Sequence, residues 1–265
     1  MEKLMTRLPG ISERPSDPLA LARMRMETAN RAQGQLRHYD CTVCRNRGYI
    51  MTLDGEGNLL SRPCKCLEIR RCVANMKRSG MEHLMEKRFD NFSSLHPWQE
   101  TLVSACKDFM EETGRWLVLC GQSGSGKTHL CSAVCRELLL QGQRVRYMLW
   151  REASNRLRDM GLDADTRHEE KEQYKSAPVL YIDDLLKTGG NGAVSSGELS
   201  LAFEILNHRY VQGLTTLIST ELSPDDLMRL DQALGGRILE KAGRYLLYIA
   251  PDKEKNMRLQ KNITG

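Results

Sequence analysis

The sequence predicts an α/β fold in which helices flank a parallel five-stranded sheet, preceded by a small N-terminal module with a helix and a cysteine cluster. From Trp98 onward, short apolar runs alternate with helical patterns, which is typical of βαβ units. A glycine-rich loop directly follows the first of these runs. Before Trp98 the chain instead carries paired cysteines and a basic surplus. We therefore expect two domains, residues 1–87 and residues 88–265.

The N-terminal module is expected to begin with a helix. Ser16, Asp17 and Pro18 are typical of a helix start, and the apolar stripe that follows them ends near Arg31. Residues 54–57, DGEG, indicate a hairpin turn within the cysteine-bearing stretch. A second helical segment, rich in basic residues, is expected to reach about Arg88.

Five apolar runs supply the strands of the predicted sheet. They cover residues 116–120, 145–149, 179–182, 216–219 and 245–249. An amphipathic helix is expected over residues 128–140, where it ends near Gly142. Another helix is expected to begin at Ser223, which suits a helix cap, with Pro224 in the first helical position.

Composition excludes membrane and secreted classes of protein. The longest apolar runs, such as the five residues from Trp116, are far shorter than the roughly 18 residues that a membrane-spanning helix needs. The N-terminus lacks the continuous apolar segment of a secretory signal. Nine cysteines are an odd number, which argues against a disulfide framework and favours a metal site or burial. We expect a cytoplasmic protein without a membrane segment.

The positive charge is concentrated near the N-terminus. The first 90 residues carry 17 Lys and Arg against 11 Asp and Glu, although the net charge of the whole chain is only +5. This asymmetry favours an acidic partner, either nucleic acid or the acidic face of another protein. A solvated surface remains an equal alternative.

The strand that begins at Trp116 leads directly into a glycine-rich loop of the P-loop pattern, GQSGSGKT. Glycines let backbone N–H groups curl around a polyphosphate, and the following helix directs its positive end at the same anion. Lys127 is expected to reach the β and γ phosphates of ATP, and Thr128 to supply a hydroxyl to Mg²⁺. The predicted ATP-binding loop comprises Gly121, Gln122, Ser123, Gly124, Ser125, Gly126, Lys127 and Thr128.

Two adjacent carboxylates end the apolar strand that begins at Val179. Asp183 and Asp184 lie at the edge of the sheet where a P-loop protein holds its metal. We expect Asp183 to hold Mg²⁺ and Asp184 to orient and deprotonate the attacking water. A helix cap after the strand is the alternative role for these residues.

The ordered motifs of residues 88–265 resemble the AAA+ ATPases of the DnaC-like helicase-loader group. Besides the P-loop, the matching segments are Arg88–Phe92, Tyr181–Lys187, Asn207–Tyr210, Thr216–Thr220, Gly236–Ile238 and Met257–Leu259. The resemblance implies an AAA+ fold, ATP hydrolysis and a role in loading a replicative DNA helicase.

Three further site residues come from this resemblance, and the chain departs from the pattern at two positions, Glu221 and Gly236, where the group often has serine. Gly236-Arg237-Ile238 is similar to the arginine-finger segment, so Arg237 is expected to face the γ phosphate bound by Lys127 of a neighbouring copy. This implies self-assembly through the ATP sites. Glu221 stands where the group usually has Asn, so the sensor role is assigned to Ser219 and Thr220.

Two cysteine pairs, CTVC and CKC, predict a structural zinc site in the N-terminal module. The ligands are expected to be Cys41, Cys44, Cys64 and Cys66, with nineteen residues between the pairs, close to the spacing of a zinc ribbon. The single residue inside the second pair is a departure from that pattern, so Cys72 and His38 remain alternative ligands. Since so small a segment buries little core, Zn²⁺ is also expected to hold it folded.

These observations lead to one main interpretation and two alternatives. The main one is ATP-dependent loading of a replicative DNA helicase onto single-stranded DNA, with residues 1–87 docking on the helicase and DNA lying along a basic inner surface. The first alternative is an ATPase helper of DNA transposition that resembles IstB proteins. The second is a DNA- or protein-binding adaptor that holds ATP as a structural ligand.

Overall fold

A computed structural model of the protein describes residues 17–37, 39–78, 80–84, 86–159, 163–187 and 193–260. Contacts divide the chain into two compact units, Met1–Arg70 and Arg71–Gly265, and each is described separately. This division falls within helix α2 (Cys66–Arg78), earlier than the predicted domain boundary at residue 88. The assignment of residues 1–87 to a docking module stays a prediction.

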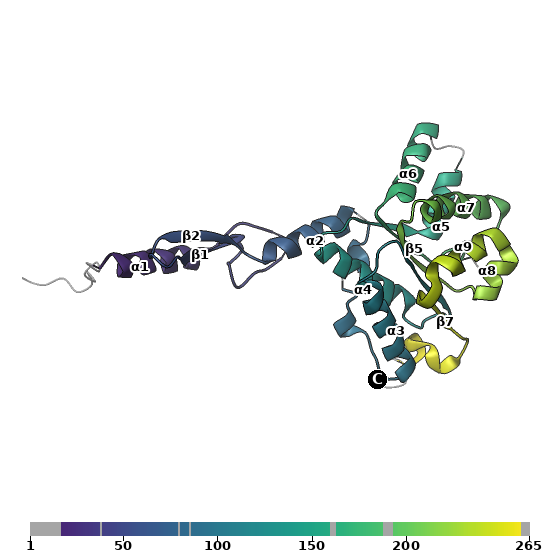
Figure 1. The fold of residues 1–265 in the computed structure, drawn as a ribbon, viewed down its shortest axis with the longest axis horizontal. Helices are drawn as coiled ribbons and strands as arrows, with labels where there is room; N and C mark the ends of the chain where they lie inside the picture. Colours follow the sequence, from purple (N-terminus) through teal and green to yellow (C-terminus); the bar gives the residue numbers. More distant parts are fainter. Residues whose placement is uncertain are drawn as a thin grey trace, which may run out of the picture. The chain divides into compact units, whose positions relative to one another are not determined.

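The N-terminal unit combines one helix with a two-stranded hairpin (Figure 1). Helix α1 (Pro18–Arg31) begins where the Asp17 carboxylate accepts hydrogen bonds from the next backbone N–H groups, as expected for an N-cap. Strands β1 (Tyr49–Leu53) and β2 (Leu59–Pro63) pair antiparallel across the predicted turn. Asn30 joins the helix to the hairpin, because its side chain bonds both the N–H and the carbonyl of Met51.

The second unit is built on a parallel sheet, which confirms the predicted fold class. In the described part of the chain, five strands pair in the order β4-β5-β6-β3-β7, and every adjacent pair is parallel. Their bounds are β3 Trp116–Gly121, β4 Val145–Leu149, β5 Val179–Asp183, β6 Thr215–Thr220 and β7 Leu246–Ile249. Because all the strands are parallel, their carboxyl ends meet at one edge of the sheet, where loops can gather functional side chains.

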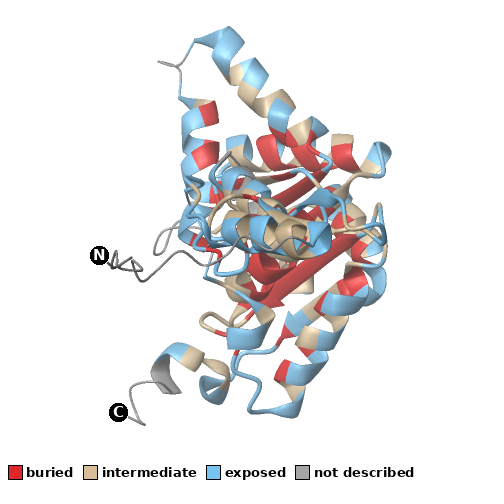
Figure 2. Ribbon diagram, turned by 90° about the vertical axis from the view of Figure 1, so that its left-hand side faces the viewer, coloured by how far each residue is buried: buried red, intermediate tan, exposed pale blue. Residues whose placement is uncertain are grey.

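Helices cover both faces of this sheet, so its inner strands β3, β5 and β6 are buried (Figures 1 and 2). One face packs against α3 (Pro97–Phe109) and α4 (Lys127–Leu140). The other packs against α5, α6, α7, α8 and α9, with bounds Trp150–Arg158, Ala164–Ser176, Ser196–Val211, Pro224–Leu230 and Gln232–Ala242. Along β3, Leu117 and Leu119 enter the first core whereas Val118 and Cys120 enter the second, as the period of a strand requires.

The structure corrects two predicted boundaries. The helical segment expected to reach about Arg88 ends at Arg78, and Gly80 follows with a φ of +78°, a left-handed conformation that favours glycine after a helix. Tyr245 belongs to a short 3₁₀ turn, so β7 begins one residue later than predicted. The remaining elements are η1 Glu82–Leu84, η2 Phe89–Asn91, η3 Gly243–Tyr245, η4 Lys253–Lys255 and α10 Met257–Gln260. Among the described helices, none combines the length and apolar character needed to cross a membrane.

A fully buried arginine ties helix α7 to the amino-terminal end of the sheet. The Arg209 guanidinium donates to Thr216 Oγ1 and to four backbone carbonyls, those of Tyr174, Lys175, Ala177 and Thr215, at 2.6–3.1 Å. Burial lowers the pKa of Arg209 to about 9. Because its planar fork serves several acceptors at once, a lysine of the same charge would leave some of them unpaired.

We therefore expect Arg209→Lys to lower the free energy of unfolding of this unit by about 2 kcal/mol. Urea unfolding followed by tryptophan fluorescence measures the change, because Trp98, Trp116 and Trp150 all lie in this unit. Arg229→Lys is the matched control, since its side chain is 75% exposed. Equal changes in the free energy of unfolding for the two variants would contradict a stabilising role of the buried Arg209 guanidinium.

Candidate functional site

The predicted phosphate loop closes between the end of β3 and the start of α4. Gly121, Gly124 and Gly126 have φ values of +97°, +75° and +92°, which only glycine adopts without strain. A Cβ at Gly124 would lie 2.2 Å from Asn256 Oδ1, and one at Gly126 would lie 2.6 Å from Phe92 Cε2. The glycines therefore provide both the curvature of the loop and the close approach of its neighbours.

Lys127 is the first residue of α4, and its side chain folds into the loop. Its ammonium donates to the carbonyls of Gly121 at 2.8 Å and Gln122 at 2.7 Å. Burial lowers the pKa of Lys127, and the negative charges of Glu221 and Asp184 oppose this effect. The loop thus holds a cationic amine beside its backbone N–H groups, where an anion can bind.

Asp183 lies buried at the end of β5, directly opposite the start of α4. Its carboxylate accepts hydrogen bonds from Thr128 Oγ1 at 3.0 Å, Tyr181 at 2.6 Å and Tyr147 at 3.1 Å, and also from the Ser219 hydroxyl. Burial and the charge of Asp183 raise the pKa of both tyrosines, so they remain donors. The Thr128 hydroxyl and the Asp183 carboxylate are thus brought together as oxygen ligands that suit Mg²⁺.

Asp184 turns away from the strand and faces the same site. Its φ of +57° lies in the left-handed region, and its N–H donates to Ser219 Oγ at 3.0 Å. Its carboxylate accepts a hydrogen bond from Lys187 at 3.0 Å. The two carboxylates therefore point to different partners, one to hydroxyl groups and the other to an ammonium.

A cavity of about 460 Å³ joins these groups, a size suited to a small ligand such as a nucleotide. Of the predicted site residues, those that line it are Ser123, Gly124, Gly126, Lys127, Thr128, Asp183 and Asp184. Gln122 and Ser125 instead bond to each other within the loop, through the Ser125 hydroxyl. Ser219 reaches the site through Asp183.

Two of the predicted residues have surroundings other than the cavity. The Thr220 hydroxyl donates to the Leu185 carbonyl and accepts from Leu222 N–H, so it holds the loop after β5. The Arg237 guanidinium lies over the rings of Phe203 and Tyr210 on α7, at 5.1 and 5.6 Å, outside the residues that line the cavity. Within one chain, the structure does not bring Arg237 to Lys127.

Several residues at the cavity could not be predicted from the spacing of sequence motifs. Phe92 and Met257 lie against Gly126, and both belong to segments identified only by resemblance. His129 packs edge-on against Phe92 and bonds the Arg88 carbonyl, so the Arg88–Phe92 segment lies beside α4. Motif spacing does not identify these residues, because they come from distant parts of the chain and meet only in the folded structure.

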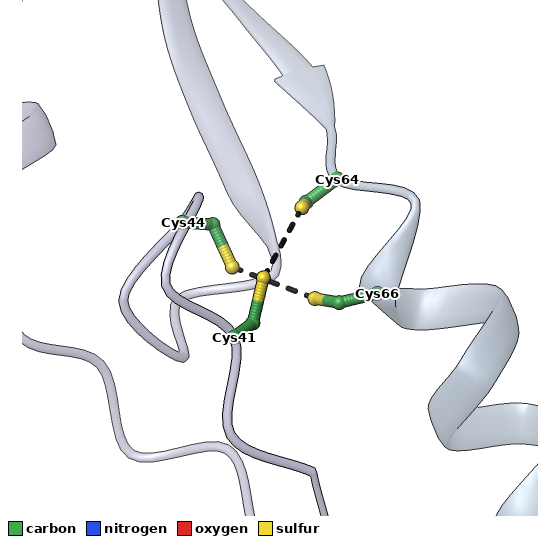
Figure 3. Close-up of side chains that lie close together, drawn as sticks. All are labelled: Cys41, Cys44, Cys64 and Cys66. Carbon is green, nitrogen blue, oxygen red and sulfur yellow. Dashed lines mark hydrogen bonds between the residues drawn. The ribbon is translucent and has the colours of Figure 1, made fainter.

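The four predicted zinc ligands converge in the N-terminal unit (Figure 3). All four sulfurs are buried and lie within 4.8 Å of one another, with 3.8 Å between Cys41 and Cys64 and 3.4 Å between Cys44 and Cys66. A tetrahedral zinc with bonds of about 2.3 Å needs sulfurs about 3.8 Å apart, so the cluster fits that ion. His38 and the side chain of Cys72 lie outside the described part of the chain.

The surroundings of one thiol favour its metal-binding form. The Gly48 N–H donates to Cys44 Sγ at 3.3 Å. Burial acts to raise the pKa of Cys44, but this backbone donor and the neighbouring thiols outweigh it and lower the pKa to about 6. Because metals bind thiolates, such a donor is suited to a sulfur ligand.

The sequence of this chain is similar to a family of ATP-binding proteins and to several known proteins. A model of IstB-like ATP binding proteins matches residues 53–259. Protein XkdC of the phage-like element PBSX from Bacillus subtilis (strain 168) is 29% identical over 249 residues, covering 86% of this chain and 90% of XkdC. The replicative helicase loader DnaC of Escherichia coli (strain K12) is 24% identical over 187 residues, covering 69% of this chain and 72% of that protein.

A solved structure extends the comparison to the fold. The crystal structure of DnaI matches with a TM-score of 0.52 and 22% identity, covering 63% of this chain and 92% of that chain. With the strand order of the parallel sheet, this likeness confirms the predicted AAA+ P-loop fold.

Proposed function

The chain belongs to the family of IstB-like ATP binding proteins, and from this premise we propose that it hydrolyses ATP to load a replicative DNA helicase onto single-stranded DNA. The observation that carries the ATPase proposal is the meeting of Lys127 and Thr128 with Asp183 and Asp184 at one cavity. These are the residue types that phosphoryl-transfer sites use for binding, metal coordination and activation of water.

Each of these residues has a distinct role in the proposed reaction. Lys127 and the loop N–H groups bind the β and γ phosphates, while the Thr128 hydroxyl and the Asp183 carboxylate hold Mg²⁺. When bound, ATP supplies the phosphoanhydride bond that water cleaves, and Mg²⁺ neutralises charge on its phosphates. Asp184 orients the attacking water and accepts its proton.

The helicase-loading part of the proposal is supported by relatives that cover most of the chain. DnaC of Escherichia coli is named a replicative helicase loader and aligns with 69% of this chain. We assign docking on the helicase to residues 1–87, and binding of single-stranded DNA to a basic inner surface of the assembled protein. Assembly of several copies through their ATP sites completes the proposal, with Arg237 of one copy serving the nucleotide of the next.

A loading assay tests this proposal. Purified protein, the replicative helicase of the same host and circular single-stranded DNA are mixed, and helicase retained on the circle after a salt wash is measured with and without ATP. We expect ATP-dependent retention that Lys127→Ala abolishes, because that change removes the cation expected at the β and γ phosphates. Association with a transposase instead would support the transposition alternative, and ATP binding without turnover would support the adaptor.

A separate prediction concerns zinc in the N-terminal module. We expect the purified protein to carry about one zinc per chain, and Cys41→Ser combined with Cys44→Ser to abolish it. The double variant should keep ATP hydrolysis but lose association with the helicase, because the ion holds the docking module and not the ATPase domain. Metal analysis and co-sedimentation measure the two effects. Absence of zinc from protein prepared without chelator would contradict the site.

A further inference from the structure

Three charged side chains form one ion-pair network at the nucleotide cavity. Lys187 Nζ lies 3.0 Å from Asp184 Oδ2 and 3.0 Å from Glu221 Oε1. All three residues line the cavity that also contains Lys127. We call these three residues the Lys187 network. Its side chains are only 29% to 38% exposed, so the charges act on one another and on a bound ligand with limited screening.

Glu221 brings a negative charge to the phosphate loop. It directly follows β6, and although burial acts to raise its pKa, the Ser123 hydroxyl and the Lys187 ammonium lower that pKa overall. The charges of both Glu221 and Lys187 also influence the pKa of Lys127. The network therefore lies close to the amine that is expected at the β and γ phosphates.

Lys187 balances part of the negative charge that carboxylates bring to this cavity. Three carboxylates, those of Asp183, Asp184 and Glu221, line the cavity, and its cationic lining residues are Lys87, Lys127, Lys187 and Arg258. Lys187 pairs with both Asp184 and Glu221, so it offsets the repulsion that these two carboxylates would exert on a polyphosphate. An ammonium carries three N–H donors, and two carboxylates leave one donor for a phosphate oxygen. Lys187 is thus both a counter-ion for Glu221 and a donor for an anionic ligand.

We propose that Lys187 donates to the terminal phosphate of bound ATP, and that Glu221 is a positioning residue that holds Lys187 there, so that the pair distinguishes ATP from ADP. This inference rests on the proposed ATP site. Asp184 accepts from the same ammonium, and the third N–H donor of Lys187 serves the terminal phosphate. Asp184 therefore keeps its place beside the terminal phosphate, and its second carboxylate oxygen can accept a hydrogen bond from water.

Equilibrium binding of fluorescent nucleotides in the presence of Mg²⁺ tests the proposal without requiring turnover. Dissociation constants are measured for ADP and for a non-hydrolysable ATP analogue. We expect Lys187→Met to weaken binding of the analogue by at least about tenfold while changing ADP binding by less than about twofold, since a charge-assisted hydrogen bond is lost only with the triphosphate. Lys171→Met is the matched control, because Lys171 also pairs with a glutamate, Glu204 at 2.9 Å, but lies outside the cavity lining.

A second substitution tests the role of Glu221. In the Lys187→Met background, Glu221 is left beside the phosphates without the Lys187 counter-ion, so adding Glu221→Gln should restore several-fold tighter binding of the analogue. A purely structural lysine would instead affect both nucleotides equally and show no such rescue. Either result would overturn the inference while leaving the ATP site intact. Failure of the unmodified protein to bind either nucleotide, or unchanged binding in Lys127→Ala, would overturn the proposed ATP site and the inference with it.

Discussion

Replacing Asp184 with asparagine is expected to leave ATP binding nearly intact and to lower the hydrolysis rate by about 100-fold or more, the usual scale for loss of a general base. Asparagine has nearly the same shape and tolerates the left-handed φ of +57° at this position. Its amide oxygen can still accept from Lys187. Asp183, which meets Thr128, remains available for Mg²⁺. Steady-state phosphate release and nucleotide titration measure the two effects.

The control for this prediction is a second aspartate that lies outside the cavity. Asp225 is exposed in the first turn of α8, so Asp225→Asn makes the same chemical change away from the nucleotide site. It should retain hydrolysis, whereas Lys127→Ala should lose binding. Normal turnover in Asp184→Asn would remove this residue from the reaction and direct attention to Glu221, the other carboxylate near the phosphate loop.

The sequence was sufficient to predict the fold because the sheet of this protein is buried on both faces. Continuous apolar runs such as Val179–Ile182 mark parallel strands, and their alternation with amphipathic helices restricts the topology to a few arrangements. The ends of the helices were predicted less closely than the helices themselves, because a helix end depends on backbone geometry. Gly80, for example, ends the helical region well before Arg88, and the apolar pattern alone does not mark that point.

Local motifs and distant contacts differed in how far they could be predicted from the sequence. The P-loop and the paired aspartates follow from short spacings, and the structure brings Thr128 and Asp183 to 3.0 Å. The Lys187 network could not be foreseen in the same way, because Glu221 and Lys187 lie 34 positions apart and meet only when β5 and β6 pair. The four cysteines converge for a simpler reason, since one hairpin joins the two pairs.

Arg237 lies outside the residues that line the nucleotide cavity of its own chain, so any action on ATP must be on the nucleotide of another copy. Its guanidinium lies over Phe203 and Tyr210 and donates to the Ala233 carbonyl. A planar, permanently charged fork suits the oxygens of a phosphate presented by another molecule. We therefore expect Arg237→Ala to leave nucleotide affinity of the single chain nearly unchanged, and to lower hydrolysis by the assembled protein by up to about 1000-fold.

Mixing of variant subunits separates this trans role from a simple defect in folding. Arg237→Ala supplies an intact pocket and Lys127→Ala supplies an intact arginine, so mixtures of the two should recover part of the hydrolysis that each lacks alone. Lys241→Ala is the matched control, because Lys241 also lies over the Tyr210 ring, at 5.1 Å, one turn further along α9. The Lys241→Ala variant loses a comparable cation–π contact, of about 0.5–1 kcal/mol at an exposed site. It should retain ATP hydrolysis. If mixtures that demonstrably co-assemble recover no hydrolysis, Arg237 does not act on a neighbouring nucleotide, and its contacts with Phe203 and Tyr210 define its role.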